Sequence, residues 1–202
     1  MSSQSNKPFK IGVTGGIACG KSLLRNILEN NGVNTIDADE IVHDMLQNDK
    51  LIIDQIIEIF GRFILKEDGG INRKELAKIV FADPDKLTKL ENIVHPHTYR
   101  VIRDFINKSE SPVIAAVIPL LLENNRQNLF DSVWLITSDE KNQIERLKNR
   151  DNMPEDEARQ RIATQMPQDM KIAMADVIID NNSTVENVEE QVIKNLENIK
   201  KT

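Results

Sequence analysis

The chain has 202 residues, of which 40% are hydrophobic and 29% are charged, and its formal net charge is −6. This length suits one α/β domain with insertions, and the composition is that of a folded globular protein. An acidic chain lacks the basic face that duplex nucleic acid requires, so no nucleic-acid partner is expected. Any anionic ligand must therefore be held by local groups.

The compartment is indicated by the cysteine content and by the first residues. The chain has one cysteine, Cys19, which cannot form an internal disulfide, and its first ten residues are too polar for a signal peptide. The longest apolar run, residues 113–122, is far shorter than the ~20 residues that cross a bilayer. We therefore expect a cytoplasmic protein with no membrane partner. The sequence leaves open whether it is a monomer or a small homo-oligomer.

The first predicted elements form a strand, a loop and a helix. Residues 10–14, KIGVT, predict a strand, and the apolar spacing after residue 21 predicts a helix that stops at Gly32. Residues 33–37, VNTID, predict a second strand, which leads into the acidic tripeptide DAD. A parallel βαβ unit is the natural interpretation.

Helical patterns dominate from residue 40 to about residue 108. NRKE at residues 72–75 predicts a capping box, and DPDK at residues 83–86 places a cap residue before a proline at the first helical position. Pro96 should kink or divide the helix that begins near Pro84. We predict a helical insertion after the second strand.

Strands resume in the second half of the chain. Three near-continuous apolar runs, typical of parallel sheets that are covered on both faces, are residues 112–118, 132–137 and 176–180. They bring the predicted strands to five. The charged stretch 138–171 predicts two helices divided near Asn152 and Pro154, and these could form a mobile hairpin. An amphipathic helix from residue 185 to about residue 199 closes the chain.

Residues 15–22, GGIACGKS, match the phosphate-loop pattern G-x-x-x-x-G-K-[ST] between a predicted strand and a predicted helix. Glycines let backbone N–H groups surround a polyphosphate, and the helix start adds partial positive charge. Lys21 would neutralise the β and γ oxygens, and Ser22 would place its hydroxyl on Mg²⁺. The pattern predicts a nucleoside triphosphate site, against the alternative of a glycine turn that merely precedes a helix.

Other motifs test whether the nucleotide is GTP. Guanine-nucleotide switches need D-x-x-G and N-K-x-D. None of the eight glycines has Asp three positions before it, and the nearest approach to the second motif, NKSE from Asn107, ends in Glu. A GTPase is therefore disfavoured.

Two carboxylates follow the second predicted strand, at the sheet edge where open α/β sheets bind ligands. Phosphoryl transfer to a hydroxyl needs one carboxylate to accept the proton and a second acidic group to hold hydrated Mg²⁺. We assign Asp39 to the base and Asp37 to the metal shell. The alternative for Asp37 is that it caps the helix that begins in DADEIVHDM.

Further segments accompany the loop and the DAD tripeptide: GGINRKELAKIVF, LENIVHPHTY, VIPLLLEN, QIERLKNRDNMPEDEARQRIATQM and ADVIIDNN. In order and spacing, and over nearly the whole chain, these segments resemble the dephospho-CoA kinases. The resemblance implies ATP-dependent phosphorylation of the ribose 3′-hydroxyl of dephospho-coenzyme A, which gives coenzyme A and ADP in the last step of coenzyme A synthesis. A kinase for nucleotides or nucleosides and an ATP-dependent switch are the alternatives.

The resemblance also implies an architecture, the P-loop kinase fold. A five-stranded parallel sheet flanked by helices would form a nucleotide-binding core from residues 8–39, 111–138 and 175–202. Residues 40–110 would form a helical substrate domain and residues 139–174 a helical lid.

Site residues follow from the same resemblance. Catalytic roles fall to Asp39, Lys21 and Arg150, and the metal would be held by Ser22 and Asp37. Arginines in the lid would neutralise charge that spreads over the transferring phosphoryl group. The residues expected to contact ATP are Gly16, Ile17, Ala18, Cys19, Gly20, Lys21, Ser22, Leu23, Arg146 and Arg150.

The chain departs from the family pattern in three places. Ala18 and Cys19 replace the usual Gly-Ser, which predicts that residue 18 needs no glycine-only backbone angle. Leu23 replaces a threonine and leaves Ser22 as the hydroxyl for the metal. His43 replaces an arginine, so the charge at that position depends on pH.

Histidines and apolar residues elsewhere have simpler interpretations. His95 and His97 form H-x-H without a third metal ligand, which favours a structural or substrate-contact role. Residues 120–122 and Trp134 are predicted core, and Glu123 could orient a lid or substrate group.

The lone cysteine has no assigned base, and the proposed reaction needs no thiol intermediate. Because Cys19 lies beside a helix start and Lys21, we expect thiolate character and protection by ATP from alkylation.

Overall fold

The computed structural model describes residues 7–201, and the chain divides into two compact units. One unit comprises the chain up to Ile36 and from Lys108 onward, and the other comprises Asp37–Asn107. Among the described residues, no helix is both long enough and apolar enough to span a membrane.

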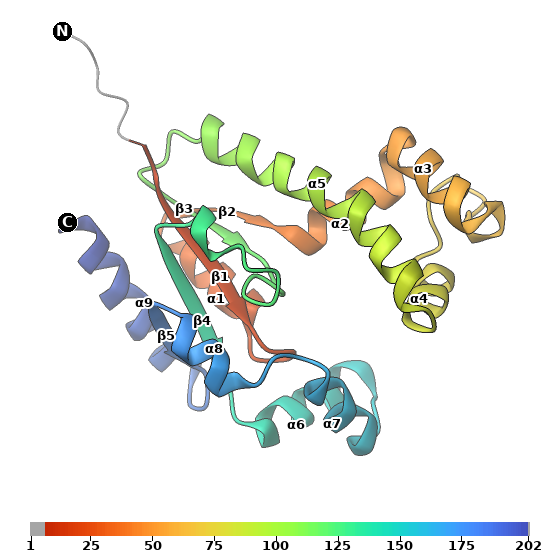
Figure 1. Cartoon of the computed structure of the whole chain (residues 1–202). Helices are drawn as coiled ribbons and strands as arrows, with labels where there is room; N and C mark the ends of the chain where they lie inside the picture. The colour runs from red at the N-terminus through yellow and green to blue at the C-terminus, as the bar shows by residue number, and fades with distance from the viewer. Residues whose placement is uncertain (1–6, 202) are drawn as a thin grey trace, which may run out of the picture. The chain divides into compact units, whose positions relative to one another are not determined.

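The first unit is built on a five-stranded sheet with the order β2-β3-β1-β4-β5 (Figure 1). β1 pairs in parallel with β3, where Ile11 lies opposite Ala115, and with β4, where Val13 lies opposite Trp134. All of β3 is buried, as expected for an interior strand covered on both faces. The predicted five-stranded parallel sheet is confirmed. The strands are β1 Phe9–Gly15, β2 Asn34–Asp37, β3 Val113–Val117, β4 Ser132–Thr137 and β5 Val177–Asp180.

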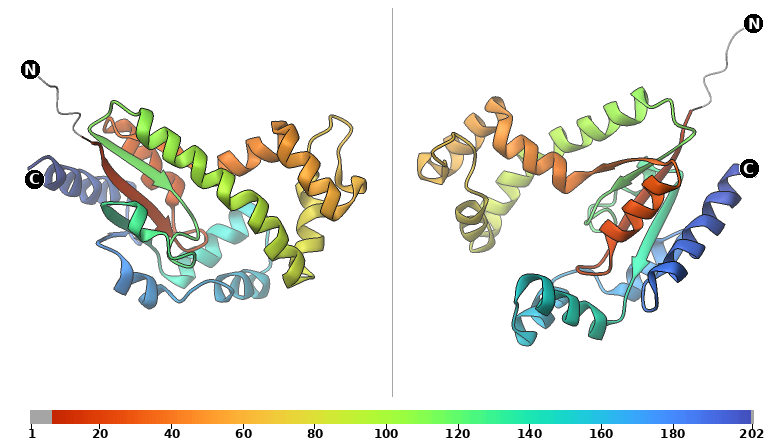
Figure 2. Two further views of the ribbon diagram at one scale, coloured as in Figure 1. Left: turned by 45° about the horizontal axis from the view of Figure 1, so that its top comes forward. Right: turned by 180° about the vertical axis from the view of Figure 1, so that it is seen from behind.

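Helices α1 (Lys21–Asn30) and α9 (Val185–Lys200) lie on one face of this sheet (Figure 2). Leu28 of α1 and Val192 of α9 are fully buried and pack with Trp134 in one apolar cluster. The predicted core position of Trp134 is therefore confirmed. Burial of apolar surface is the main favourable contribution to folding, so this cluster anchors the helix that follows the phosphate loop.

The turn after β3, residues 119–125, buries two of its three leucines. Leu121 and Leu122 are fully buried, while Leu120 is 40% exposed. Consecutive side chains in a helical turn point in different directions, so three adjacent leucines cannot all face one core. The core prediction is therefore wrong for Leu120. A short 3-10 helix, η2 (Gln127–Leu129), follows this turn.

Three helices connect β4 to β5: α6 (Glu140–Asp151), α7 (Glu155–Ala163) and α8 (Gln168–Met174) (Figure 1). The two predicted helices are confirmed, and Asn152 ends the first of them in a left-handed conformation with φ 51°. The sequence analysis missed α8, because seven residues are too few for a convincing helical period. A small apolar cluster joins α6 to α7 through Ile144, Leu147, Met153 and Ala158.

The second unit is helical, as predicted. Its helices are α2 (Ala38–Asn48), α3 (Lys50–Phe60), the 3-10 helix η1 (Arg62–Ile64), α4 (Arg73–Phe81) and α5 (Pro84–Lys108), the last of which ends at the unit boundary. Asn72 accepts hydrogen bonds from the backbone N–H groups of Lys74 and Glu75, so the predicted cap of α4 is confirmed. An apolar cluster that includes Ile56 and Leu76 forms the core of this unit.

Pro96 lies inside α5, which continues without interruption from Pro84 to Lys108. Of the two predicted outcomes, a kink or a division, division of the helix is therefore excluded. Proline removes one helical hydrogen bond, but Val94 and Ile102 are buried on either side of it. Tertiary packing of these side chains outweighs the single missing bond, because packing supplies most of the stability of helices in proteins.

Candidate active site

The phosphate loop connects the end of β1 at Gly15 to the start of α1 at Lys21. The Lys21 ammonium donates to the carbonyl oxygens of Gly15 and Gly16 at 2.8 and 3.0 Å. Ser22 is exposed in the first turn of α1. Gly20 adopts φ 109°, and a Cβ there would overlap the Asn181 amide, so this position requires glycine.

Ala18 adopts φ 57°, which lies in the left-handed region. The prediction that residue 18 needs no glycine-type angle is therefore wrong. The loop reverses sharply at this position, and a Cβ in this conformation costs about 1–2 kcal/mol. Contacts that surround the loop must offset this cost.

Cys19 is fully buried and belongs to the apolar cluster under the sheet. Its backbone N–H donates to the Gly16 carbonyl at 3.3 Å. Burial raises the pKa of the Cys19 thiol, and the opposing charge of Lys21 is a smaller effect. The predicted thiolate character is therefore contradicted, because desolvation disfavours the charged form.

Two glutamines hold the peptide groups of Ile17. The Ile17 N–H donates to Oε1 of Gln165 at 2.7 Å, and the Ile17 carbonyl accepts from Nε2 of Gln143 at 2.6 Å. Both glutamines lie more than 120 residues away in the sequence. The sequence analysis did not identify either of them.

Arg146 and Asn181 hold the next carbonyls of the loop. One terminal nitrogen of Arg146 donates to the carbonyls of Ala18 and Cys19 at 3.0 and 3.4 Å. The buried amide of Asn181 donates to the Cys19 carbonyl at 2.7 Å. In this structure the Arg146 charge therefore faces loop carbonyls. Gln143 and Arg146 are three residues apart on α6 and so share a helix face, which is a spacing that the sequence displays.

The side chains of Arg150 and Leu23 do not contact the carbonyls of the phosphate loop in the interactions described above. The Arg150 side chain is 64% exposed and makes two 2.8 Å hydrogen bonds to the carboxylate of Asp151. These bonds raise the pKa of the guanidinium and lower the pKa of the carboxyl group. Leu23 is half-buried and packs against the apolar cluster, so only its backbone is suited to contact a nucleotide.

The acidic pair begins the second unit. Asp37 is the last residue of β2 and the N-cap of α2, and its Oδ1 accepts from the N–H groups of Asp39 and Glu40 at 2.8 and 3.4 Å. The capping alternative therefore describes what this carboxylate does here. Asp39 is exposed in the first turn of α2.

Each histidine has a ring contact within the second unit. Nδ1 of His43 lies 2.6 Å from the Arg73 guanidinium, and Nδ1 of His97 lies 3.1 Å from that of Arg100. The His95 ring packs edge-on against Tyr99. Within residues 7–201, no group of three or more His, Cys, Asp or Glu side chains could hold a metal ion.

Glu123, at the end of the PLLLE segment, pairs with Lys171 of α8 at 2.6 Å. The Lys171 side chain is only 2% exposed. In the described part of the chain, no other polar group completes the hydrogen bonding of this ammonium or this carboxylate. Because this buried pair has so few other partners, removing either residue should strongly destabilise the fold.

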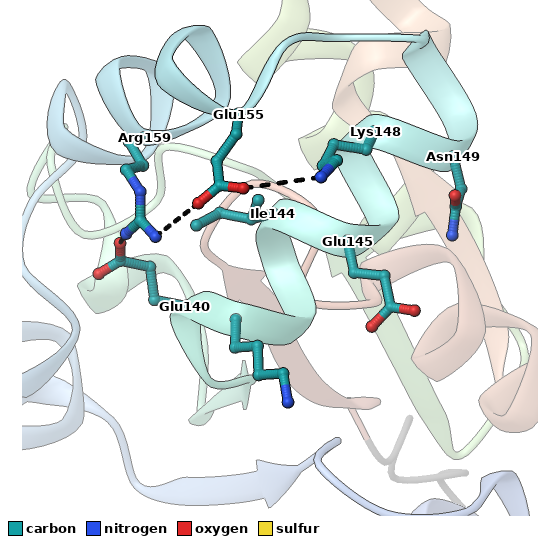
Figure 3. Close-up of a pocket in the computed structure, with 8 residues that line it drawn as sticks. Glu140, Ile144, Glu145, Lys148, Asn149, Glu155 and Arg159 are labelled. Carbon is teal, nitrogen blue, oxygen red and sulfur yellow. Dashed lines mark hydrogen bonds and ion pairs between the residues drawn. The ribbon is translucent and has the colours of Figure 1, made fainter.

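A separate pocket of about 670 Å³ is lined by residues of α6 and α7 (Figure 3). Glu155 lies between Lys148 and Arg159, and Arg159 also pairs with Glu140. Three acidic and three basic side chains line the pocket and balance its charge: Glu140, Glu145, Glu155, Lys141, Lys148 and Arg159. Exposed pairs of this kind contribute little to stability and do not favour an anion.

A phosphate loop between the first strand of a parallel sheet and the helix that covers it defines the class of P-loop nucleotide-binding proteins. The comparisons identify the family within that class. The family model described as dephospho-CoA kinase matches residues 9–187. The chain belongs to the dephospho-CoA kinase family.

Individual relatives carry the same family name. The dephospho-CoA kinase of Streptococcus mutans is 43% identical over 185 residues, covering 90% of this chain and 93% of that protein. The dephospho-CoA kinase of Shouchella clausii is 41% identical over 187 residues, covering 91% and 95%.

Among solved structures, the dephospho-CoA kinase of Campylobacter jejuni superposes with a TM-score of 0.65 at 28% identity, covering 96% of this chain and 98% of that one. A shikimate kinase of Aquifex aeolicus, at 18% identity and a TM-score of 0.52, covers 94% and 96% of the two chains and shows the shared fold alone.

Proposed function

We propose that this chain transfers the γ-phosphoryl group of ATP to the ribose 3′-hydroxyl of dephospho-coenzyme A, the last step of coenzyme A biosynthesis. The observation that carries this conclusion is the family match over residues 9–187, which includes both the phosphate loop and the DAD tripeptide. A kinase for other hydroxyl acceptors would need the same loop, so the acceptor decides between the alternatives.

ATP would be held by the phosphate loop. The N-terminus of α1 directs backbone N–H groups and partial positive charge toward a bound anion. Lys21 is held over the loop by two carbonyls and would exchange them for β and γ oxygens. Arg150 would exchange its exposed contact with Asp151 for the transferring phosphoryl group.

Asp39 is proposed as the carboxylate that orients the acceptor hydroxyl and takes its proton. Its exposure and its place in the first turn of α2 leave the side chain accessible to a substrate. We further propose that residues 40–110 receive dephospho-coenzyme A and that residues 139–174 form the lid. The small apolar cluster that joins α6 to α7 supports a lid in which these two helices keep their mutual arrangement.

Mg²⁺ would be held by Ser22 and Asp37. Hydroxyl and carboxylate oxygens are the donors that Mg²⁺ prefers, and this ion keeps water and phosphate oxygens as its other ligands. When bound, the ion would neutralise charge on the β and γ oxygens.

The test is to mix the protein with Mg-ATP and each candidate acceptor and to measure ADP and phosphorylated product. We expect one ADP for each coenzyme A formed from dephospho-coenzyme A, and little ADP with nucleosides, nucleotides or water alone. Faster and stoichiometric turnover of a nucleoside or nucleotide would replace this proposal with the related kinase activity.

A further inference from the structure

Ile17 is one of the points at which the α6–α8 segment is attached to the phosphate loop, beside the contacts of Arg146 with the next two carbonyls. Gln143 comes from α6, and Gln165 comes from the connection between α7 and α8, and together they hydrogen-bond both polar backbone groups of this one residue. Residues whose backbone donor and acceptor are both held by side chains cannot rotate their peptide planes without losing those bonds.

Apolar packing reinforces the same attachment. The side chains of Ile17 and Ala18 pack against the small apolar cluster of α6 and α7, and so does Ile162. A cavity of about 70 Å³ lies beside this contact and is lined by Gly16, Gln165 and other residues of the segment. The loop and the segment are therefore in contact on both polar and apolar surfaces.

The attachment keeps Ala18 in an unfavourable backbone conformation. Its left-handed backbone is unfavourable for a residue with a Cβ, so the loop would relax if its neighbours released it. Gln165 holds the N–H of the residue directly before Ala18. A loop that relaxes must be ordered again before it can surround a triphosphate, and this cost weakens binding.

We propose that Gln165 is a positioning residue for ATP: its side-chain oxygen fixes the Ile17 peptide and so keeps the phosphate loop in the shape that receives the triphosphate. This inference rests on the proposed function in taking ATP as the ligand of the loop. Gln165 acts through the loop, so its effect should fall on ATP affinity while the chemical step is largely preserved.

The test compares Gln165→Met with the wild-type protein. Methionine keeps the length and volume of the side chain but lacks an oxygen acceptor. We expect the Kd and the KM for ATP to rise about five- to ten-fold, as for the loss of one hydrogen bond. The kcat should stay within about two-fold, and the KM for dephospho-coenzyme A should not change. If Gln165 had only a structural role, the variant would contain less active protein, and the remaining active protein would keep the wild-type Kd for ATP.

The matched control is Gln160→Met, which makes the same change at an exposed position of α7. An unchanged ATP Kd in Gln165→Met, or an equal change in the control, would overturn the proposal. The Kd is measured by calorimetry without an acceptor. Wild-type protein that binds ATP but leaves dephospho-coenzyme A unphosphorylated therefore counts against the proposed function alone.

A second variant covers the case in which Gln165→Met does not fold. Gln165→Glu keeps an oxygen that accepts from the Ile17 N–H and adds a charge that repels the triphosphate. At about 0.5 M salt, where screening weakens this repulsion, its ATP Kd should move toward the wild-type value under the same conditions. A loss of affinity that is equally large at low and high salt would contradict the role of the oxygen.

Discussion

The phosphate loop and the helix starts of the second unit are held in opposite ways. In the loop, the carbonyls of residues 17–19 and the N–H group of Ile17 are bound by side chains from α6, from the α7–α8 connection and from the residue that follows β5. In the second unit, Asp37, Asp49, Asn72 and Asp83 each cap a helix whose N–H groups lie two or three residues away. Local caps form with the helix itself, whereas the loop acquires its shape only when distant segments have packed.

The largest expected effect comes from breaking a long-range contact. Lys171→Ala would leave Glu123 as a buried charge without its partner and should lower the free energy of unfolding by about 3–5 kcal/mol. Chemical denaturation measures this. The double variant Glu123→Gln with Lys171→Met removes both charges and should recover most of the loss. If the double variant is as unstable as Lys171→Ala, the explanation from an unpaired charge is wrong.

Asp37 and Asp39 allow a helix cap to be compared with a proposed catalytic group two residues away, because Asp37 caps α2 and Asp39 is the proposed base. Asp39→Asn should reduce kcat by at least ~10²-fold, the range for a lost general base, and leave the ATP Kd nearly intact. Asp37→Asn keeps a capping side chain but loses the charge, so unfolding should be unchanged while the Mg²⁺ concentration needed for activity rises. Near-normal turnover of Asp39→Asn would remove Asp39 from the chemistry.

A local cap should matter less than the buried pair. Asp83→Ala removes the acceptor for two N–H groups at the start of α5 and should lower the free energy of unfolding by about 1 kcal/mol. Thermal or urea unfolding measures this change. Asn caps nearly as well as Asp, so Asp83→Asn serves as the control, and equal losses in the two variants would argue against the cap.

The smallest expected effect is a gain. Ala18→Gly removes the Cβ from a left-handed backbone position and should raise the free energy of unfolding by about 0.5 kcal/mol, after the added flexibility of the unfolded chain is subtracted. The Tm should rise slightly. A clear fall in Tm would mean that apolar packing of the Ala18 methyl group outweighs its backbone strain.

Patterns with a short period predicted most of the fold. The five strands, the helix after the phosphate loop and the two charged helices at Asn152 each leave a periodic or capping signal in adjacent residues. Two expectations failed where neighbours in space decide: Leu120 faces outward, and Pro96 does not divide a packed helix. The helix α8 was missed because it is too short to show a period.

The sequence by itself determined the phosphate loop, the strand and helix that flank it, and the family to which the chain belongs, because these depend on residue types at fixed local spacing. Tertiary structure alone decided that Ala18 takes a left-handed angle, that burial raises the pKa of Cys19, and that Gln165 holds Ile17. These properties arise from contacts between residues more than a hundred positions apart and from the solvent that packing removes, and neither leaves a pattern among adjacent residues.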